Sequence, residues 1–344
     1  MRVKKTEPAM RAIAFTKSLP ATDPNALVDL ALPLPEPGPR DLRVRVEAVS
    51  VNPVDTKVRA RAGSDTPRVL GYDAAGIVDA VGAAVTLFKP GDRVYYAGTI
   101  DRPGTNAEYH LVDERIVGRM PATLDFAEAA ALPLTTITAY ELLFDRIGVR
   151  KGKGADNRSL LVVGGAGGVG SMAIQLARAL TDLTVIATAS RPETVDWVKG
   201  LGAHHVVDHT KPLDEEVARI GIPAVDIVLS LTQTLHHWPA IQKLVAPQGH
   251  VGVIDDMPTL DIVPFKGKAV GVHWESMFTR PVHQTADMIE QHKLLNEVAG
   301  LVEAGRVRTT LTNRVGPINA AVLRDVHQLV ESGRSIGKTV VAGW

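Results

Sequence analysis

The sequence contains no cysteine. This absence excludes disulfide bonds, thiolate nucleophiles, iron–sulfur clusters and every structural zinc site that is built from cysteine ligands. Net charge is missing as well, because 38 basic residues balance 38 acidic ones. Such a chain has no overall field that would attract nucleic acid or an anionic membrane. We therefore expect neither a nucleic-acid partner nor a membrane partner.

Long apolar segments are scarce. The longest uncharged stretch, residues 159–177, contains five glycines and begins like a buried strand, which argues against a membrane span. Residues 1–10 carry three basic side chains with no apolar core after them, so they do not resemble a signal peptide. Together these features predict a cytoplasmic protein.

The residues that are present predict two domains of the α/β class. The chain has 344 residues, 45% of them hydrophobic, which is enough for two cores. The first third contains alternating and apolar runs separated by Gly- and Pro-rich turns, as in a β-rich domain. From about Leu134, short β-branched runs alternate with amphipathic segments, a pattern typical of a doubly wound parallel sheet with helices on both faces. Residues 268–274 are the expected last strand of that sheet, and residues 283–304 have helical spacing.

A glycine-rich motif follows the first strand of the parallel series. Gly165, Gly167 and Gly170 satisfy G-x-G-x-x-G between a predicted strand and a predicted helix. Glycines permit a tight turn and a close approach of a diphosphate, whose charge the N–H groups of Gly168 and Val169 would stabilise. The motif predicts dinucleotide binding. The alternative is a turn whose glycines only allow the helix and strand to pack closely.

The end of the next strand favours NADP(H) over NAD(H). No Asp or Glu lies between Thr188 and Arg191, where one would bind the ribose hydroxyls of NAD. Ser190 and Arg191 instead offer a hydroxyl and a guanidinium suited to a 2′-phosphate. The alternative is structural: Ser190 and Glu193 could form a capping box for a helix that carries Pro192 in its first turn.

Several segments resemble one enzyme family. They are SVNPVDTKVR, VLGYDAAGIVDAVG, FKPGDRVYYAG, NAEYHLVDE, AAALPLTTITAYELL and AGGVGSMAIQLA. Together they resemble the medium-chain dehydrogenase/reductase superfamily in its zinc-free quinone oxidoreductase branch, and MFTR and SRPE resemble a subgroup named zinc-type alcohol dehydrogenase-like. The resemblance implies a GroES-like β-rich catalytic domain at residues 1–133, to which residues 276–344 return. It also implies a Rossmann NADP-binding domain at residues 134–275.

The chain departs from the zinc-containing members of that superfamily. Asn52 stands where they have a cysteine, Tyr72 and Asp73 stand within their Gly-His-Glu element, and residues 134–136 offer no ligand at the third position. Their four-cysteine structural loop is also absent. A catalytic zinc needs three protein ligands, and only Asp73 could supply one. We therefore expect no metal.

Without a metal, an electrophilic acceptor such as a quinone or an α,β-unsaturated carbonyl is the expected substrate. The resemblance implies that Asn52 donates to a substrate oxygen, that Tyr72 donates a hydrogen bond or a proton, and that Lys57 stands where some relatives have a tyrosine. Each has a structural alternative, because Asn52 could close a turn, Tyr72 could fill vacated volume, and solvent could supply the proton. Asp55 is expected to orient local backbone or Arg59.

The resemblance also implies further cofactor contacts. Thr136 would bind the nicotinamide carboxamide, Ile254 and Phe278 would line the ring, Lys338 would approach from the returning strand, and His209 would lie near the adenosine phosphate. Capping, core and loop roles are the alternatives at these positions.

Partners and rival functions complete the expectations. Residues 268–274 form an exposed edge strand, which we expect to join its symmetry mate in a homodimer. Two other functions stay open: a zinc-dependent alcohol dehydrogenase with atypical ligands, and an NADPH-binding protein with little turnover.

Overall fold

The computed structural model describes residues 9–61 and 63–344. The chain divides into two compact units: unit 1 comprises Met1–Leu134 and Phe278–Trp344, and unit 2 comprises Thr135–Met277. The sequence predicted boundaries after residues 133 and 275, against Leu134 and Met277 here. Residues 1–8, the subject of most of the signal-peptide argument, lie outside the described residues.

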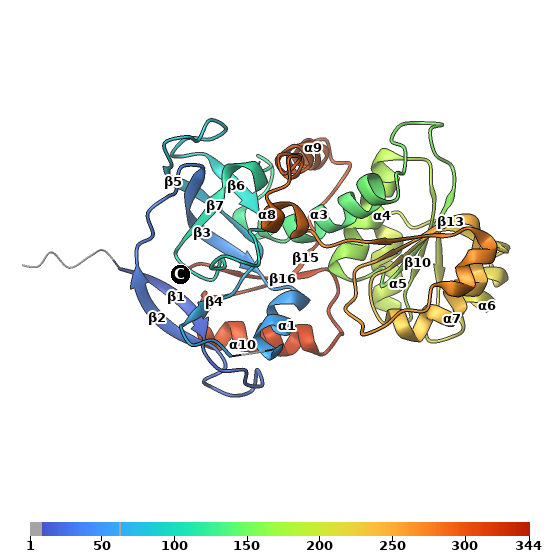
Figure 1. The fold of residues 1–344 in the computed structure, drawn as a ribbon, viewed down its shortest axis with the longest axis horizontal. Coiled ribbons are helices and arrows are strands. Elements are labelled where there is room, and N and C mark those ends of the chain that lie inside the picture. Colours follow the sequence, from blue (N-terminus) through green and yellow to red (C-terminus); the bar gives the residue numbers. More distant parts are fainter. Residues whose placement is uncertain (1–8, 62) are drawn as a thin grey trace, which may run out of the picture. The chain divides into compact units, whose positions relative to one another are not determined.

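Unit 1 is built mainly from β-strands. They are β1 (Ala9–Phe15), β2 (Val28–Pro33), β3 (Asp41–Ser50), β4 (Arg68–Val69), β5 (Ala74–Val81), β6 (Arg93–Tyr96), β7 (Tyr109–Asp113), β8 (Val117–Arg119), β15 (Leu311–Val315) and β16 (Lys338–Ala342). The larger sheet has the order β15-β16-β3-β5-β6-β8, with β7 also paired to β3, and the smaller sheet has the order β2-β1-β4. In Figure 1 the red C-terminal strand β16 lies beside the blue strand β3, and their pairing is antiparallel. The last strand of the chain therefore joins the sheet whose first strand in the sequence is β3.

Six helical segments belong to the described part of unit 1. They are α1 (Pro53–Arg61), η1 (Glu114–Ile116), α2 (Phe126–Ala130), α8 (Thr279–His283), α9 (Glu290–Glu303) and α10 (Ala320–Glu331). The single helix predicted over residues 283–304 is wrong in its first part. Gln284 adopts a left-handed conformation with φ 48°, which ends α8, and the next helix begins only at Glu290.

Unit 2 contains a parallel sheet. Its strands are β9 (Ser159–Val163), β10 (Thr184–Thr188), β11 (His205–Val207), β12 (Val225–Ser230), β13 (Val245–Val253) and β14 (Gly271–Trp274). Its helices are α4 (Gly168–Leu180), α5 (Pro192–Gly200), α6 (Leu213–Arg219), α7 (Thr234–Leu244) and η3 (Val263–Lys268), after α3 (Pro133–Tyr140) and η2 (Glu141–Arg146) at its start. The strand order β11-β10-β9-β12-β13-β14 is that of the doubly wound dinucleotide-binding fold. The predicted α/β class is confirmed.

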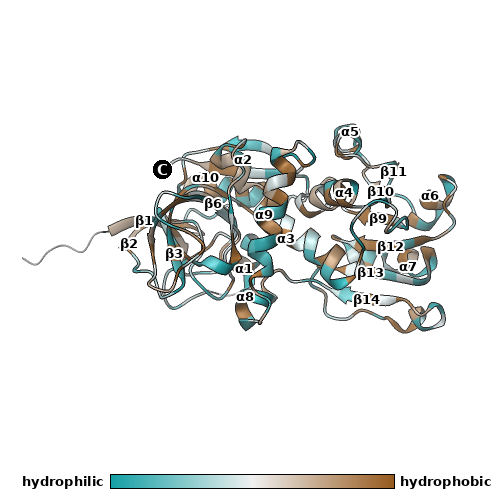
Figure 2. Ribbon diagram, turned by 90° about the horizontal axis from the view of Figure 1, so that it is seen from above, coloured by the Kyte–Doolittle hydropathy of each residue, from teal (hydrophilic) through white to brown (hydrophobic). Residues whose placement is uncertain are grey.

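The core of unit 2 follows from the apolar central strands, whose ribbons β9 and β12 are largely brown in Figure 2. Leu161, Ile186 and Val228 from three neighbouring strands are fully buried and pack with Ile241 of α7. Strands buried on both faces read as continuous apolar runs, which is why the sequence showed them clearly. No helix among residues 9–61 and 63–344 is long and apolar enough to cross a bilayer.

The last strand of this sheet is shorter than predicted. Lys268 belongs to η3, and its Nζ donates to the carbonyl oxygens of Gln242, Lys243 and Val245 at 2.7–3.1 Å, around the end of α7. The left-handed Ala269 then ends η3, so β14 begins only at Gly271. Among the described strands, β14 pairs with β13 alone.

Candidate functional site

The glycine motif forms the turn between β9 and α4 in unit 2. Gly164 has φ +86°, a conformation that favours glycine. A Cβ atom on Gly170 would lie 2.2 Å from the Gly164 oxygen, and one on Gly165 would lie 3.1 Å from the Thr188 oxygen. A Cβ atom on Gly167 would meet only the Gly164 oxygen, at 3.5 Å. Gly165 and Gly170 therefore permit close packing, whereas Gly167 keeps one side of the loop open.

The N-terminus of α4 is free of side-chain caps. Gly168 and Val169 open the helix, and the N-cap residue Gly167 has no side chain to accept from their N–H groups. The 13-residue helix α4 directs its positive dipole end toward the same place. These features fit the diphosphate of a dinucleotide, which needs close backbone approach and N–H donors.

Ser190, Arg191 and His209 gather beyond the ends of β10 and β11. Ser190 Oγ lies 3.5 Å from His209 Nε2. Arg191 makes an exposed ion pair with Glu193, with Nε and Oε1 3.2 Å apart, so its guanidinium is accessible to a ligand. His209 Nδ1 is buried and has no hydrogen-bond partner within the described residues. The three residues predicted to bind a 2′-phosphate therefore lie close together.

The structural alternative for Ser190 is wrong. The N-cap residue of α5 is Arg191, and the Thr194 hydroxyl accepts from the Arg191 N–H at 3.1 Å, so no box forms between Ser190 and Glu193. Pro192 occupies the first helical turn, as predicted. The exposed Ser190 thus lies outside the helix.

Unit 1 contains a buried polar network formed by Asn52, Asp73 and Lys338. Asp73 Oδ2 accepts from Asn52 Nδ2 at 2.7 Å and lies 3.3 Å from Lys338 Nζ, while its Oδ1 accepts from the Leu134 N–H at 2.7 Å. Lys338 Nζ also donates to Asn52 Oδ1 and, at 3.0 Å, to the Val51 oxygen. Asn52, Asp73 and Lys338 are at most 4% exposed. Lys338, predicted to contact the cofactor, is the cation of this network; its contact with a cofactor stays a prediction.

Asp55 lies against the network and binds backbone. Its carboxylate accepts from the N–H groups of Asn52 at 2.7 Å and Gly71 at 3.0 Å. The predicted orientation of local backbone is therefore present, whereas Arg59 bonds to His327 and Glu331 instead.

Burial controls the ionisation of these groups. It raises the pKa of Asp55 to about 7, against the hydrogen bond from Asn52 and the charge of Lys338. It likewise raises the pKa of Asp73 to about 6, with Lys338 again opposing, and it lowers the pKa of Lys338. Each charge therefore depends on its partners.

Tyr72 lies in the chain between Gly71, whose N–H donates to Asp55, and Asp73. Its hydroxyl is buried and makes no hydrogen bond of ordinary geometry within the described residues, although the Arg68 guanidinium lies near enough to interact with it. Burial, and then the negative charge of Asp55, raise the pKa of Tyr72 to about 12, with Arg68 opposing. The ring packs edge-on against Phe278 with centroids 5.3 Å apart. This phenol stays protonated at neutral pH, and no acceptor among the described residues takes its hydrogen, which suits a hydrogen-bond donor.

The other predicted residues are more scattered. Asn52 directs its two amide hydrogens to Asp73 and, at 3.4 Å, to the Ser50 oxygen, which differs from the expected donor to substrate. Lys57 lies half-buried on α1. Thr136 is fully buried in α3, and its hydroxyl has no partner within the described residues, which leaves it available to an amide. Ile254 is half-buried just after β13.

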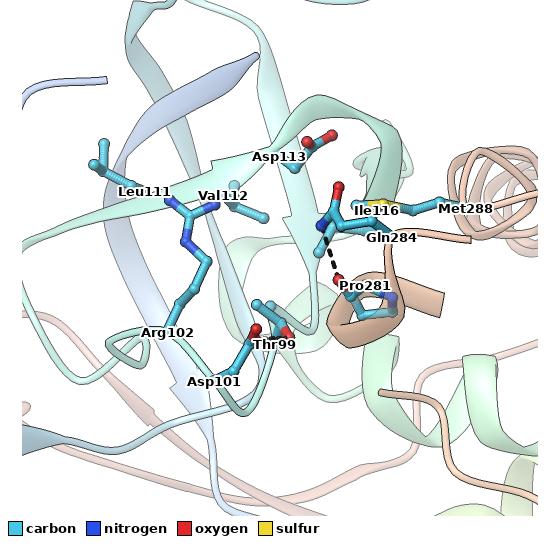
Figure 3. Close-up of a pocket in the computed structure, with 11 residues that line it drawn as sticks. Thr99, Asp101, Arg102, Leu111, Val112, Asp113, Ile116, Pro281, Gln284 and Met288 are labelled. Carbon is cyan, nitrogen blue, oxygen red and sulfur yellow. Dashed lines mark hydrogen bonds between the residues drawn. The ribbon is translucent and has the colours of Figure 1, made fainter. Parts of the chain in front are cut away.

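A small hollow of unit 1 is drawn in Figure 3. It measures about 30 Å³, the volume of roughly one water molecule, and Asp101, Arg102 and Asp113 line it. Arg102 is paired with Asp41 through two contacts of 2.9 Å, and Gln284 Nε2 donates to the Pro281 oxygen at 2.8 Å. The hollow is too small for an organic substrate.

The sequence reasoning missed the joint role of Asp55, Asp73 and Lys338. A usable signal existed, because both acids and the lysine are flanked by apolar or small residues in VNPVD, LGYDAAGIV and IGKTVVAG. Charged residues in buried segments are almost always paired, so the three could have been matched by charge.

Comparison with known proteins gives consistent matches. Residues 38–122 match the family described as the alcohol dehydrogenase GroES-like domain, and residues 201–341 match the zinc-binding dehydrogenases. A solved structure from Rhizobium etli, provisionally described as a zinc-dependent alcohol dehydrogenase, is 59% identical with a TM-score of 0.95, and the match covers 98% of this chain and 99% of that one.

Two curated relatives extend the comparison. The zinc-type alcohol dehydrogenase-like protein of Staphylococcus epidermidis is 38% identical over 96% of this chain and 99% of its own length. The quinone oxidoreductase of Lama guanicoe is 33% identical over 69% of this chain and 70% of its own length.

The word zinc in these names invites a test of the residues present. Both oxygens of Asp73 already accept from N–H donors. The Lys338 ammonium lies 3.3 Å from Asp73 Oδ2 and would repel a metal cation bound to that carboxylate. Within the described part of the chain, no three His, Cys, Asp or Glu residues are grouped to hold a metal ion. A zinc site needs three or more such ligands, so the donor set does not fit zinc.

Proposed function

This chain belongs to the medium-chain dehydrogenase/reductase superfamily, and from that premise we propose that it is an NADPH-dependent, metal-independent reductase of quinones or α,β-unsaturated carbonyls. The quinone oxidoreductase among its relatives supports the acceptor class. A cytoplasmic location is part of the proposal.

One observation carries the metal-independent part: the ammonium of Lys338 neutralises Asp73 inside unit 1. A protein cation at this position stabilises the buried carboxylate, and the carboxylate is then not available as a ligand for a metal ion. Oxidation of an alcohol would then lack a strong stabiliser for the alkoxide. An acceptor that is already electrophilic requires only orientation, a hydride and a proton.

The residues of unit 2 fit the cofactor. The loop at Gly165, Gly167 and Gly170 would hold the diphosphate, and Ser190, Arg191 and His209 would hold a 2′-phosphate. When bound, NADPH supplies the hydride. Thr136 offers a free buried hydroxyl that would orient the nicotinamide amide.

The residues of unit 1 would handle the proton. Asp55 accepts from the Gly71 N–H, and the Asp73 side chain is held by Asn52, Lys338 and the Leu134 N–H, so both residues next to Tyr72 are fixed. Tyr72 keeps its proton at neutral pH and would donate a hydrogen bond from its hydroxyl to the acceptor oxygen.

We expect Tyr72→Phe to lower kcat/KM for a quinone about tenfold, because the variant loses the donor while solvent still delivers the proton. Steady-state oxidation of NADPH measures the change. Tyr109→Phe, which changes a half-buried tyrosine on β7, serves as the control and should retain full activity. Equal rates for the wild type and Tyr72→Phe would remove Tyr72 from the reaction.

The function itself is tested with purified, chelator-treated protein. We expect it to oxidise NADPH faster than NADH with a 1,4-quinone or a short enal as acceptor. Activity that vanishes with the chelator and returns with zinc would instead establish the zinc-dependent dehydrogenase. Tight NADPH binding without turnover of either acceptor would establish a binding protein.

We also propose a homodimer formed through β14. This strand ends the sheet order of unit 2, and Trp274 on it is 55% exposed, beside the 52% exposed Ile262 in the preceding segment. An unpaired edge with apolar side chains favours pairing with a second copy. Sedimentation equilibrium should therefore give about twice the chain mass of 36.8 kDa. A mass of one chain at micromolar concentration would contradict the dimer.

A further inference from the structure

His209 faces Ser190 because their two strands are neighbours. β10 and β11 pair in parallel, with Thr188 opposite Val207, so the residues just beyond each strand lie side by side. The Ala189 N–H donates to the Val207 oxygen at 3.0 Å and holds the two strand ends together. The 3.5 Å separation between Ser190 Oγ and His209 Nε2 leaves both atoms able to turn toward a shared ligand.

Among the described residues, the one hydrogen-bond contact of the His209 ring in the free protein is the 3.5 Å approach of Ser190 Oγ to Nε2. Its Nδ1 is buried without a hydrogen-bond partner within the described residues. Burial lowers the pKa of His209, and the charge of Arg191 lowers it further, against the charge of Asp208. His209 is therefore mostly neutral at neutral pH in the absence of a ligand.

The charged neighbours of His209 come from four segments. Its own loop contributes Asp208, and Arg191 precedes α5 as its N-cap. Glu216 of α6 accepts from the Asp208 N–H at 3.1 Å, and α7 contributes His237. Asp208 is engaged locally, because its carboxylate accepts from the N–H and hydroxyl of Thr210. Burial lowers the pKa of His237 to about 4, so His237 stays neutral through the physiological range.

We propose that His209 takes up a proton when a 2′-phosphate binds beside Ser190 and Arg191, and thereby makes the preference for NADP(H) over NAD(H) stronger as the pH falls. The inference rests on the proposed function, because it concerns the same nucleotide site. A phosphate dianion within hydrogen-bond reach favours the imidazolium, which completes a cluster of two cations and a hydroxyl. A ligand without that phosphate would not raise the pKa of His209, so its binding would take up no proton there.

The sign of the effect follows from linkage. The pKa of His209 would be lower in the free protein than in the complex with NADP⁺. Binding that takes up a proton weakens as the pH rises from the lower pKa to the higher one. The phosphate itself has a pKa of about 6 and releases a proton on binding below that value, so the test belongs above about pH 7. There, the two effects are separated.

The experiment is isothermal titration calorimetry of the full chain with NADP⁺ and NAD⁺, which share all groups except the 2′-phosphate. Titrations at about pH 7.5 in two buffers of different ionisation enthalpy give the number of protons taken up. We expect an uptake of about 0.3–0.9 proton with NADP⁺ and almost none with NAD⁺. The ratio of the Kd for NAD⁺ to the Kd for NADP⁺ should fall about three- to tenfold between about pH 7 and pH 8.5.

Variants assign the proton. His209→Gln should abolish the uptake with NADP⁺ and leave NAD⁺ binding unchanged, whereas His205→Gln on β11 is the matched control and should behave as the wild type. Uptake that persists in His209→Gln would overturn the assignment to His209. Tighter binding of NADP⁺ without uptake or pH dependence would overturn the inference alone. Equal affinity for NADP⁺ and NAD⁺ at every pH would overturn the NADP preference of the proposed function instead.

Discussion

Replacing Lys338 with methionine is expected to lower the free energy of unfolding by about 3–5 kcal/mol. The variant would leave the Asp73 carboxylate buried without its cation, and the oxygens of Asn52 and Val51 without their donor. Methionine has a similar length, so the loss arises from charge and hydrogen bonding rather than from a cavity. Urea denaturation at about pH 8, followed by circular dichroism, measures it.

The pH dependence of that loss separates charge from packing. Asp73 has a pKa of about 6 in the folded protein against 3.8 for the ordinary carboxyl group. The folded state therefore binds more protons than the unfolded state between these values, and stability falls as the pH rises through them. Without Lys338 the folded pKa rises further, so the fall continues to higher pH.

Lys338→Met should accordingly be less destabilised at about pH 5 than at about pH 8. The double variant Lys338→Met, Asp73→Asn removes both charges and should be more stable than Lys338→Met alone at about pH 8. Lys293→Met is the control, because Lys293 is 61% exposed and pairs only on the surface, where such a change costs about 0–1 kcal/mol. A loss of the same size at both pH values would contradict the charge argument.

Gly170→Ala should lower the free energy of unfolding by about 2–4 kcal/mol and weaken NADP⁺ binding more than tenfold. The new methyl group would lie 2.2 Å from the Gly164 oxygen and 2.8 Å from the Gly165 Cα. Both neighbours are backbone atoms, which cannot rotate away, so α4 must move relative to β9. Thermal unfolding and calorimetric titration measure the two effects.

Gly167→Ala is the matched substitution in the same loop. Its φ of −73° and ψ of 174° suit alanine, and the nearest atom to the new methyl group lies at 3.5 Å, so stability should change by less than about 1 kcal/mol. The methyl group would nevertheless cover the side on which a diphosphate approaches, and NADP⁺ affinity should fall about tenfold. Unchanged NADP⁺ affinity in Gly167→Ala would contradict the binding of the diphosphate at this loop.

The sequence predicted features that depend on neighbours along the chain. The parallel strands, the glycine turn and the final strand β16 all have local patterns of apolar residues or glycine, and the structure contains each of them. Element ends were less accurate, since single backbone conformations decide them. Gln284 and Ala269 adopt left-handed conformations, so α9 and β14 begin later than predicted. Neither glutamine nor alanine favours that conformation, so the sequence does not predict it.

The buried network could not be derived in the same way. The contact between Asn52 and Lys338 joins residues 286 positions apart, and only the pairing of β16 with β3 brings them together. No spacing rule connects such residues, because tertiary topology rather than local geometry determines their neighbours. The resemblance implied a contact of Lys338 with the cofactor, and it did not imply the contacts of Lys338 with Asp73 and Asn52.

Because β16 is the last strand in the sequence, it is synthesised after every other strand of both units. Asp55 and Asp73 leave the ribosome early, and all of unit 2 follows before the strand that carries Lys338 is made. Nascent unit 2 has all its strands by that time and can fold first, while unit 1 holds two acids without their ammonium and β3 without one of its neighbouring strands. A chain halted before residue 338 would consequently retain the dinucleotide-binding unit but have an incomplete catalytic one, exposed to proteases and chaperones until its final residues arrive.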